Sequence, residues 1–212
     1  MRAVRRLGPR NRALVTAQWQ TGFRISEILS LTIGSVARDG RVRSEIGVAP
    51  RYLKGGYGNT RYIPVLPELQ RALEGYLLWL QHRMAISPAL PLFLSREHNA
   101  DGSARALSCE SARRIVHRAF VLGGIENDGR LGTHTLRKTW ARNVYVNSGN
   151  DLLVVRSALG HSDVSVTQHY LEPDRAAVLQ AIRRCDFTRK PRRHSGNNTL
   201  PFPALRETSP AA

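Results

Sequence analysis

Apolar side chains recur at helical spacing along most of this 212-residue chain. The clearest case is segment 67–83, where Pro67 stands at the start and the apolar positions share one face of an amphipathic helix. Those positions are Leu69, Leu73, Tyr76, Leu77 and Leu80. The same spacing predicts further helices over 13–20, 26–33, 109–123, 135–147, 151–159, 163–171 and 173–185.

Capping residues set the expected ends of several of these helices. Ser26 is the expected N-cap of the second helix, and Ser108 opens the helix over 109–123. Asp151 or Asn150 caps the helix over 151–159, and Gly160 stops it. Most of the chain is therefore predicted to be helical.

Residues 41–65 break the helical pattern. The stretches RVRSEIGV and RYIPV are rich in residues that favour strands, and the segment KGGYGN between them holds three glycines and an asparagine. Pro64 indicates an edge position at the end of a strand. The sequence therefore predicts a mainly α fold with a small antiparallel β-sheet near the N-terminal third.

The length fits one large domain with a tail. After Phe187 the chain turns to Pro, Ser, Asn and charged residues, so we expect a folded domain over 1–186 and a basic, flexible tail over 187–212. No apolar stretch approaches the roughly 20 residues that span a bilayer. The basic N-terminus has no apolar region before a cleavage site, and two cysteines exclude a disulfide framework. We expect a cytoplasmic protein without a membrane partner.

Charge is the strongest feature of the composition. Lys and Arg number 32 against 16 Asp and Glu, which gives a formal net charge of +16 and favours a polyanionic partner. The only lysines are Lys54, Lys138 and Lys190, so the basic residues are overwhelmingly arginine. The planar guanidinium fork suits phosphate, which favours nucleic acid. A GC-rich genome raises Arg over Lys as well, so both explanations stay open.

Four segments far apart in the sequence carry side chains suited to phosphate chemistry: TGFRISE, LKGG, HTLR and LGHSDVSVTQHY. The candidate residues within them are Arg24, Lys54, His134, Arg137, His161 and Tyr170. Two guanidinium groups can bind the non-bridging oxygens of one phosphate, and tyrosine can act as a covalent nucleophile. Histidine can move a proton, and lysine can protonate a leaving alkoxide. With no carboxylate pair or metal-ligand set, the group fits metal-free phosphoryl transfer through a phosphotyrosine, without a cofactor.

These motifs also resemble a known family, the tyrosine recombinases or phage integrases. The resemblance covers roughly residues 13–175. Its strongest stretch, 134–170, is similar to the family's His-x-x-Arg motif, its Leu-Gly-His segment and the nucleophilic tyrosine nine residues after that histidine. TGFRISEILSL resembles the motif of the first catalytic arginine, and LKGGYGNTRYIPV resembles the hairpin with the catalytic lysine. The resemblance implies the tyrosine recombinase catalytic-domain fold and site-specific DNA strand cleavage and rejoining.

Matched residue by residue, the resemblance implies a role for each candidate. Tyr170 would attack the scissile phosphate and stay linked to the 3′ side, while Arg24 and Arg137 hold the phosphate oxygens. Glu27, one helical turn after Arg24, would support the site. The covalent bond would conserve the phosphodiester energy, so neither ATP nor a metal is implied.

The remaining three candidates would handle protons. His134 and His161 would hydrogen-bond the phosphate and assist proton transfer, and Lys54 would protonate the leaving 5′ oxygen. The position of Lys54 is the least fixed, because the turn after it is long and Arg61 lies on the return strand. Tyr145 is expected to pack inside the fold rather than act as a nucleophile.

The chain also departs from the family pattern. Only 23 residues precede Arg24, so we expect the catalytic domain without the N-terminal core-binding domain that many members carry. The implied partner is double-stranded DNA, bound by a homotetramer in a synaptic complex. The helix over 173–185 is expected to dock either on a neighbouring protomer or within its own chain.

Two other functions stay open. A nicking-closing enzyme similar to type IB topoisomerases would use the same six residues, and only synapsis of paired half-sites separates it from a recombinase. A regulator that keeps the fold and binds DNA without cleaving it is the non-enzymatic alternative. Arg113, Arg114 and Arg118 on the helix over 109–123 face either DNA or solvent. Trp140 is expected to pack in the core.

Overall fold

The computed structural model describes residues 3–49, 60–125, 131–160 and 167. The chain divides into two units, Met1–Glu172 and Pro173–Ala212. All described residues belong to the first unit. Of the predicted helix over 163–171, Thr167 is described, and it is helical and buried. The predicted helix over 173–185 and the tail over 187–212 lie outside the described residues.

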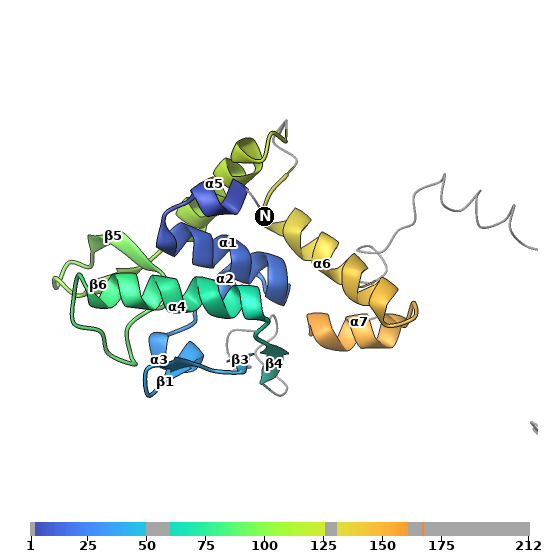
Figure 1. Cartoon of the computed structure of the whole chain (residues 1–212), viewed down its shortest axis with the longest axis horizontal. Coiled ribbons are helices and arrows are strands. Elements are labelled where there is room, and N and C mark those ends of the chain that lie inside the picture. The colour runs from blue at the N-terminus through green and yellow to red at the C-terminus, as the bar shows by residue number, and fades with distance from the viewer. Residues whose placement is uncertain (1–2, 50–59, 126–130, 161–166, 168–212) are drawn as a thin grey trace, which may run out of the picture. The chain divides into compact units, whose positions relative to one another are not determined.

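Helices dominate the described part of the chain, as the sequence predicts (Figure 1). A 3-10 helix, η1, spans Ala3–Arg6, and the α-helices are α1 (Pro9–Thr21), α2 (Ile25–Leu29), α3 (Ile33–Val36), α4 (Pro67–Gln81), α5 (Cys109–Leu122), α6 (Thr133–Asn147) and α7 (Leu152–Leu159). The expected caps form at α5 and α7. The Ser108 side chain accepts a hydrogen bond from the Ser111 amide, and the Asp151 side chain accepts from the amides of Leu153 and Val154. Gly160 ends α7 in the left-handed conformation, as predicted.

Within the described ranges, the strands pair as three separate antiparallel hairpins. They are β1 (Ala37–Arg38) with β2 (Arg41–Val42), β3 (Glu45–Val48) with β4 (Arg61–Pro64), and β5 (Leu94–His98) with β6 (Ala104–Ala106). In the β3–β4 pair, Ile46 lies opposite Ile63 and Val48 opposite Arg61. The β3–β4 pair confirms the predicted small antiparallel sheet, whereas residues 41–48 form two strands instead of one, and β2 pairs with β1, which the sequence did not predict. The β5–β6 hairpin was not predicted, because β5 is mostly polar and exposed and β6 is only three residues long.

The predicted helix over 26–33 is wrong in two respects. Ser26 lies inside α2, and the N-cap position belongs to Arg24, whose amide donates to the Glu27 side chain at 2.6 Å. The helix also stops at Leu29, and α3 begins separately at Ile33. The interruption comes from the segment 90–92, because the Ile33 amide bonds to the Leu90 carbonyl at 2.9 Å and Thr32 pairs with Pro91. Tertiary pairing therefore overrides the local helical pattern.

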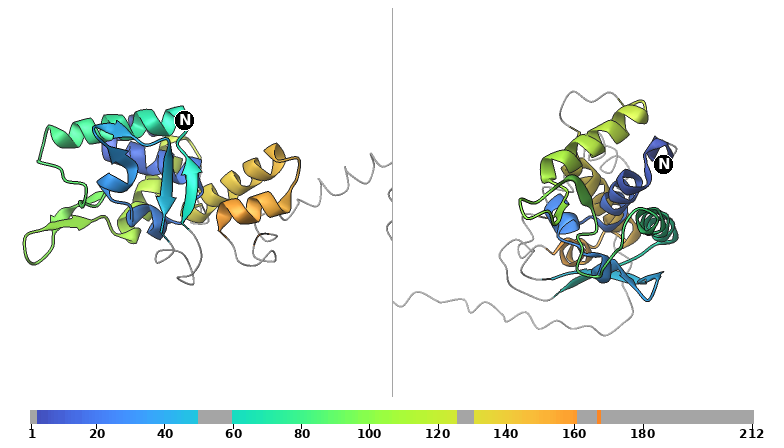
Figure 2. Two further views of the ribbon diagram at one scale, coloured as in Figure 1. Left: turned by 90° about the horizontal axis from the view of Figure 1, so that it is seen from below. Right: turned by 90° about the vertical axis from the view of Figure 1, so that its left-hand side faces the viewer.

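The core lies mainly between α1 and α4 and continues to β3, β4 and the start of α5. A second cluster joins η1, α1, α5 and α6 through Leu7, Val15, Val116 and Leu136. A third cluster joins α6 and α7 through Ala141, Val155 and Leu159. Helices α6 and α7 lie side by side, as Figure 1 and the left view of Figure 2 show. No helix in the described ranges has the length and apolar character of a membrane span.

Candidate functional site

The structure describes three of the six predicted site residues: Arg24, His134 and Arg137. Arg24 lies between α1 and α2, and His134 and Arg137 lie in the first turns of α6. Lys54, His161 and Tyr170 lie outside the described residues. The arrangement of the first three therefore tests only part of the predicted site.

A tight corner between α1 and α2 positions Arg24. Gly22 ends α1 with φ 62°, a left-handed conformation that suits glycine, and Phe23 is buried. The side chain of Glu27 is fully buried and accepts two hydrogen bonds from Arg24, one from the backbone amide at 2.6 Å and one from Nη1 at 2.7 Å. The Arg24 side chain remains 22% exposed, so part of its guanidinium faces solvent.

Helix α6 packs directly on this corner. The Trp140 indole donates from Nε1 to the Gln20 carbonyl at 2.9 Å, and a Cβ on Gly22 would lie 2.2 Å from the Trp140 ring. The buried Gln18 amide bonds the carbonyls of Phe23 (2.8 Å) and Thr133 (3.4 Å) and so joins the corner to the start of α6. Trp140 is therefore confirmed as a packing residue.

Arg137, the second predicted phosphate-binding arginine, lies inside the same corner as Arg24. Its side chain is 1% exposed, and its Nη1 donates to the Gly22 carbonyl. Its Nη2 donates to the Leu159 carbonyl at 2.9 Å, at the end of α7. Nη1 also lies 3.9 Å from Oε2 of Glu27. The two predicted phosphate-binding arginines thus share one carboxylate, across more than one hundred residues of sequence.

A third arginine, Arg61 on β4, joins the same carboxylate. Its Nη2 bonds Oε2 of Glu27 at 2.7 Å, its Nη1 donates to the Leu159 carbonyl, and its guanidinium lies 4.6 Å from the centre of the Phe23 ring. Sequence reasoning gave Arg61 no role. The signal that could have found it is strand alternation, because Arg61 shares the buried face of β4 with Ile63.

The cluster carries more positive than negative charge. Three guanidinium groups surround one carboxylate, in a place largely closed to water. Burial by itself raises the pKa of Glu27, but Arg61, the hydrogen bonds from Arg24 and the charge of Arg137 outweigh it, so the pKa lies below its ordinary value. Glu27 is therefore ionised at neutral pH, and the surplus positive charge can attract an anion.

His134 stands at an exposed position in the first turn of α6, within the electrostatic reach of the arginines. Partial burial lowers its pKa, and the positive charges of Arg137, Arg113, Arg24 and Lys138 lower it further. The imidazole is therefore neutral at pH 7, and it can both accept a proton and donate a hydrogen bond.

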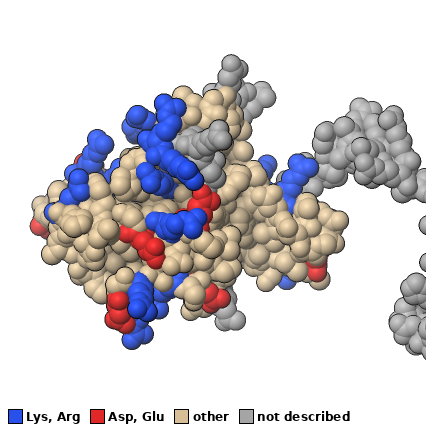
Figure 3. Space-filling model, in the orientation of Figure 1, with Lys and Arg blue, Asp and Glu red and all other residues tan. Residues whose placement is uncertain are grey.

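Basic side chains also cover the surface beside the site. On α5, Arg113 and Arg114 are 60% and 74% exposed, and both lie close to Glu110, at 3.8 and 3.3 Å. In Figure 3, basic side chains gather over the upper part of the visible face, where η1, α1 and α5 lie in Figure 1. A surface of this charge suits a polyanion.

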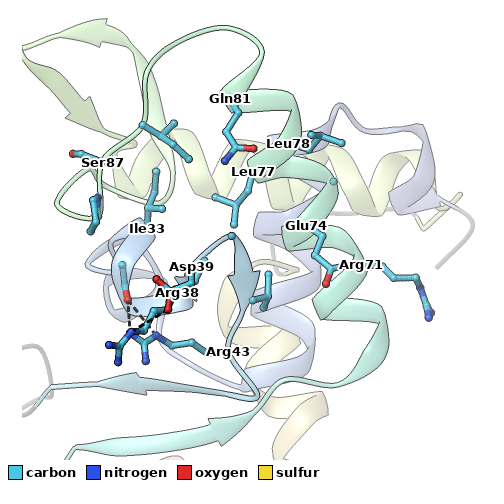
Figure 4. Close-up of a pocket in the computed structure, with 17 residues that line it drawn as sticks. Ile33, Arg38, Asp39, Arg43, Arg71, Glu74, Leu77, Leu78, Gln81 and Ser87 are labelled. Atoms are coloured by element: carbon cyan, nitrogen blue, oxygen red, sulfur yellow. Dashed lines mark hydrogen bonds and ion pairs between the residues drawn. The ribbon is translucent and has the colours of Figure 1, made fainter.

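A cavity of about 790 Å³ lies elsewhere, between the β1–β2 hairpin, α4 and residues 86–88 (Figure 4). Its described lining mixes apolar side chains such as Ile33 and Leu77 with Arg38, Arg43 and Arg71. Arg43 is held by the Gly34 carbonyl through two hydrogen bonds, at 3.2 and 3.1 Å. Arg24, His134 and Arg137, the three predicted site residues that the structure describes, are not part of this lining. The described part of the candidate site therefore lies outside this cavity, in the arginine cluster.

Comparison with known proteins agrees with the motifs. The model of the phage integrase family matches residues 1–176. The tyrosine recombinase XerC of Rhodospirillum centenum is 30% identical over 200 residues, which cover 92% of this chain and 50% of the relative. The tyrosine recombinase XerD of Yersinia pestis is 32% identical over 166 residues, which cover 76% of this chain and 49% of the relative. The chain thus spans about half the length of these relatives.

Solved structures share the fold. A crystal structure of the XerA recombinase aligns with a TM-score of 0.64 at 23% identity and covers 84% of this chain and 60% of that one. The XerH site-specific recombinase, in a post-cleavage complex with a palindromic difH substrate, aligns with a TM-score of 0.65 at 23% identity. That alignment covers 86% of this chain and 49% of the XerH chain. The mainly helical architecture with small antiparallel sheets is therefore confirmed.

Proposed function

The chain belongs to the phage integrase family, and from that premise we propose that it is a site-specific DNA recombinase. It cleaves and rejoins DNA strands through a 3′-phosphotyrosyl intermediate and uses neither a metal nor ATP. The relatives XerC and XerD are named tyrosine recombinases, and the XerH neighbour is a site-specific recombinase bound to its difH substrate. The single observation that carries the proposal is the convergence of Arg24, Arg61 and Arg137 on the buried Glu27.

This convergence supports a phosphate site for an electrostatic reason. A scissile phosphate gains negative charge on its non-bridging oxygens in the transition state, and preorganised guanidinium groups stabilise that charge at little reorganisation cost. The partly exposed Arg24 offers donors on the solvent side, and the neutral His134 stands nearby. Glu27 keeps the arginines in place without cancelling their combined charge.

The proposed reaction needs one bond made and one bond broken in each direction. The hydroxyl oxygen of Tyr170 attacks the phosphorus, the bond to the 5′ oxygen breaks, and Lys54 supplies a proton to that oxygen. His134 and His161 hydrogen-bond the phosphate and assist the transfer of the tyrosine proton. Attack by a 5′-hydroxyl on the phosphotyrosine then restores the diester and frees the tyrosine.

The proposed partner is double-stranded DNA, bound by a homotetramer that pairs two recombination sites. The exposed arginines of α5 supply sequence-independent phosphate contacts, which predict an affinity that falls steeply with salt. The proposed catalytic domain covers residues 1–186, and its helix over 173–185 docks either on a neighbouring protomer or within its own chain. The basic tail over 187–212 is available for contacts to DNA.

Covalent trapping tests the proposal. The full chain is incubated in EDTA with plasmid that carries the DNA flanking its own gene, and SDS-stable adducts are scored for wild type and Tyr170→Phe. Tyr145→Phe is the matched control, because Tyr145 is half-buried on α6 and packs in the α6–α7 cluster. We expect adducts in wild type and Tyr145→Phe and none in Tyr170→Phe.

Other outcomes point to other functions. Tight binding without an adduct contradicts the enzymatic proposal and favours a DNA-binding regulator. Adducts that relax supercoiled DNA without exchange between paired sites favour a nicking-closing enzyme. An adduct that survives Tyr170→Phe contradicts the assignment of the nucleophile.

A second substrate tests Lys54 alone. Replacing the 5′-bridging oxygen at the cleaved phosphate with sulfur creates a thiolate leaving group, which needs no proton because thiols are far more acidic than alcohols. We expect Lys54→Ala to cleave this substrate at nearly the wild-type rate and the normal substrate far more slowly. An equal loss on both substrates contradicts the proton-donor role.

A further inference from the structure

We propose that Arg61 is a positioning residue that holds the end of α7, at Leu159 and Gly160, against the Arg24–Glu27 corner. The importance of this placement for DNA cleavage rests on the proposed function. The placement itself rests on the contacts of one side chain that has no expected catalytic role.

Arg61 connects three separate parts of the fold. Its guanidinium bonds Glu27 of α2 at 2.7 Å, donates to the carbonyl of Leu159 at the end of α7, and covers the ring of Phe23. The side chain is 7% exposed, and its backbone is fixed in β4 opposite Val48. A planar fork with several donors can make these contacts together, whereas a lysine ammonium cannot match that geometry.

The group on α7 that accepts these hydrogen bonds is the carbonyl oxygen of Leu159. Leu159 is the last residue of the helix, so its carbonyl has no partner within the helix and carries part of the negative end of the helix dipole. Arg61 and Arg137 both donate to this one oxygen. Two cations on a terminal carbonyl fix both the position and the direction of the helix end.

Among the described residues, apolar packing between β4 and α7 does not replace these contacts of Arg61. The apolar cluster of α7 is shared with α6, and a cavity of about 780 Å³ lies between α7 and β4. Exposed side chains such as Tyr62 and Leu153 line that cavity on its two sides. The placement of α7 relative to β4 therefore depends strongly on the polar contacts of Arg61.

Gly160 fits the same arrangement. It has φ 64°, and a Cβ at this position would lie 3.0 Å from Nη1 and 3.3 Å from Cδ of Arg61. The close approach of Arg61 thus adds to the conformational requirement for glycine immediately after Leu159. The next residue is His161, the second histidine of the proposed reaction. Arg61 therefore holds the residues that immediately precede this histidine in the sequence.

The first test measures α7 directly in the DNA-free full chain. Amide hydrogen exchange of residues 152–160 is compared for wild type, Arg61→Lys and the control Arg10→Lys. Arg10 is a half-buried arginine that donates to the Leu94 carbonyl at 2.6 Å, so its substitution removes a similar contact elsewhere. We expect exchange in this segment to rise about tenfold or more in Arg61→Lys and to change less than about twofold in Arg10→Lys.

The second test separates cleavage from binding. Single-turnover adduct formation is measured at saturating protein, together with the Kd for the same DNA. We expect Arg61→Lys to slow adduct formation about tenfold to a hundredfold, because small misplacements of reacting groups cost that much, with the Kd within about twofold of wild type. Arg10→Lys should leave both quantities unchanged.

Three results overturn the proposal. The first is unchanged amide hydrogen exchange at residues 152–160 in Arg61→Lys. The second is a lower melting temperature of Arg61→Lys with an unchanged cleavage rate. The third is weaker DNA binding, seen as a higher Kd, with an unchanged cleavage rate. If wild type itself forms no adduct, the proposed function fails, and the exchange measurement alone decides whether Arg61 places α7. If Arg61→Lys does not fold, slow exchange of the Arg61 Nη protons in wild type upholds the bridge and rapid exchange overturns it.

Discussion

Glu27 and Arg61 form an ion pair of 2.7 Å with side chains that are 0% and 7% exposed, although they lie on different elements and 34 positions apart. The same carboxylate receives two hydrogen bonds from Arg24 and lies 3.9 Å from Arg137. One acidic side chain therefore organises the three arginines on which the proposed phosphate site depends.

Removing this carboxylate should destabilise the fold. Glu27→Gln keeps the shape but leaves three guanidinium groups without their buried counter-charge. Because breaking a buried ion pair on one side typically costs 3–5 kcal/mol, we expect the free energy of unfolding to fall by about 3 kcal/mol. Urea denaturation followed by circular dichroism measures the change.

Glu110→Gln is the matched control, since Glu110 pairs with Arg113 and Arg114 on the surface of α5. Exposed pairs contribute little, so this substitution should cost less than about 1 kcal/mol. Equal losses for Glu27→Gln and Glu110→Gln would contradict the central position of Glu27.

The Glu27 carboxylate should also affect how the free energy of unfolding falls at acid pH. The pKa of Glu27 in the folded state lies below its ordinary value of 4.5, so the unfolded chain binds the proton more readily than the folded one. The contribution of Glu27 is therefore complete above pH 4.5 and is lost as the pH falls toward the folded-state pKa. Urea midpoints measured from pH 6 to pH 3 should drop less steeply in Glu27→Gln than in wild type. Parallel curves would show that Glu27 does not titrate in this way.

His134 should titrate below its ordinary pKa of 6.5. Partial burial is the first cause, and the positive charges around it add to the effect, so removing one charge should raise the pKa. We expect Arg113→Gln to move the NMR titration of His134 upward. Arg105→Gln on β6 is the control and should not move it, because Arg105 is not among the charges that act on His134. An unshifted titration in Arg113→Gln would place α5 too far from the site.

Gly22 should tolerate no larger side chain. Its φ is 62°, and an added Cβ would lie 2.2 Å from the Trp140 ring, so both backbone strain and a clash oppose Gly22→Ala. Gly102→Ala is the control, since Gly102 also has a positive φ, 78°, but has open space around it. We expect about 1 kcal/mol of lost stability for Gly102→Ala and about 1–3 kcal/mol more for Gly22→Ala. Thermal unfolding that shows equal losses would contradict the close packing of α6 on the corner.

Local signals in the sequence predicted much of the fold. The caps at Ser108 and Asp151 and the stop at Gly160 satisfy backbone groups within a few residues, so their effects can be deduced from neighbours in sequence. The break after Leu29 could not be predicted in this way, because it depends on pairing with residues 90–92. The β5–β6 hairpin could not be predicted either, because β5 is mostly polar and exposed and β6 is too short to show a pattern.

The same distinction between local signals and tertiary contacts applies to the candidate site. Arg24, His134 and Arg137 stand in motifs that can be recognised in sequence, and the structure brings the two arginines onto one carboxylate. Arg61 lies in the segment that resembles the lysine hairpin, but the motif gives it no role, and its importance depends on contacts with α2 and α7 that only the folded chain reveals. The proposed roles of Lys54, His161 and Tyr170 stay predictions.

The central claim is that Tyr170 becomes joined to DNA, and locating the joined residue tests it most directly. Covalent complexes of the full chain are formed on DNA with a nick beside the cleaved phosphate, digested with nuclease and protease, and analysed by mass spectrometry. The account predicts a nucleotide linked through its 3′-phosphate to the peptide that contains Tyr170. A nucleotide on another residue, or a linkage through a 5′-phosphate, would contradict it.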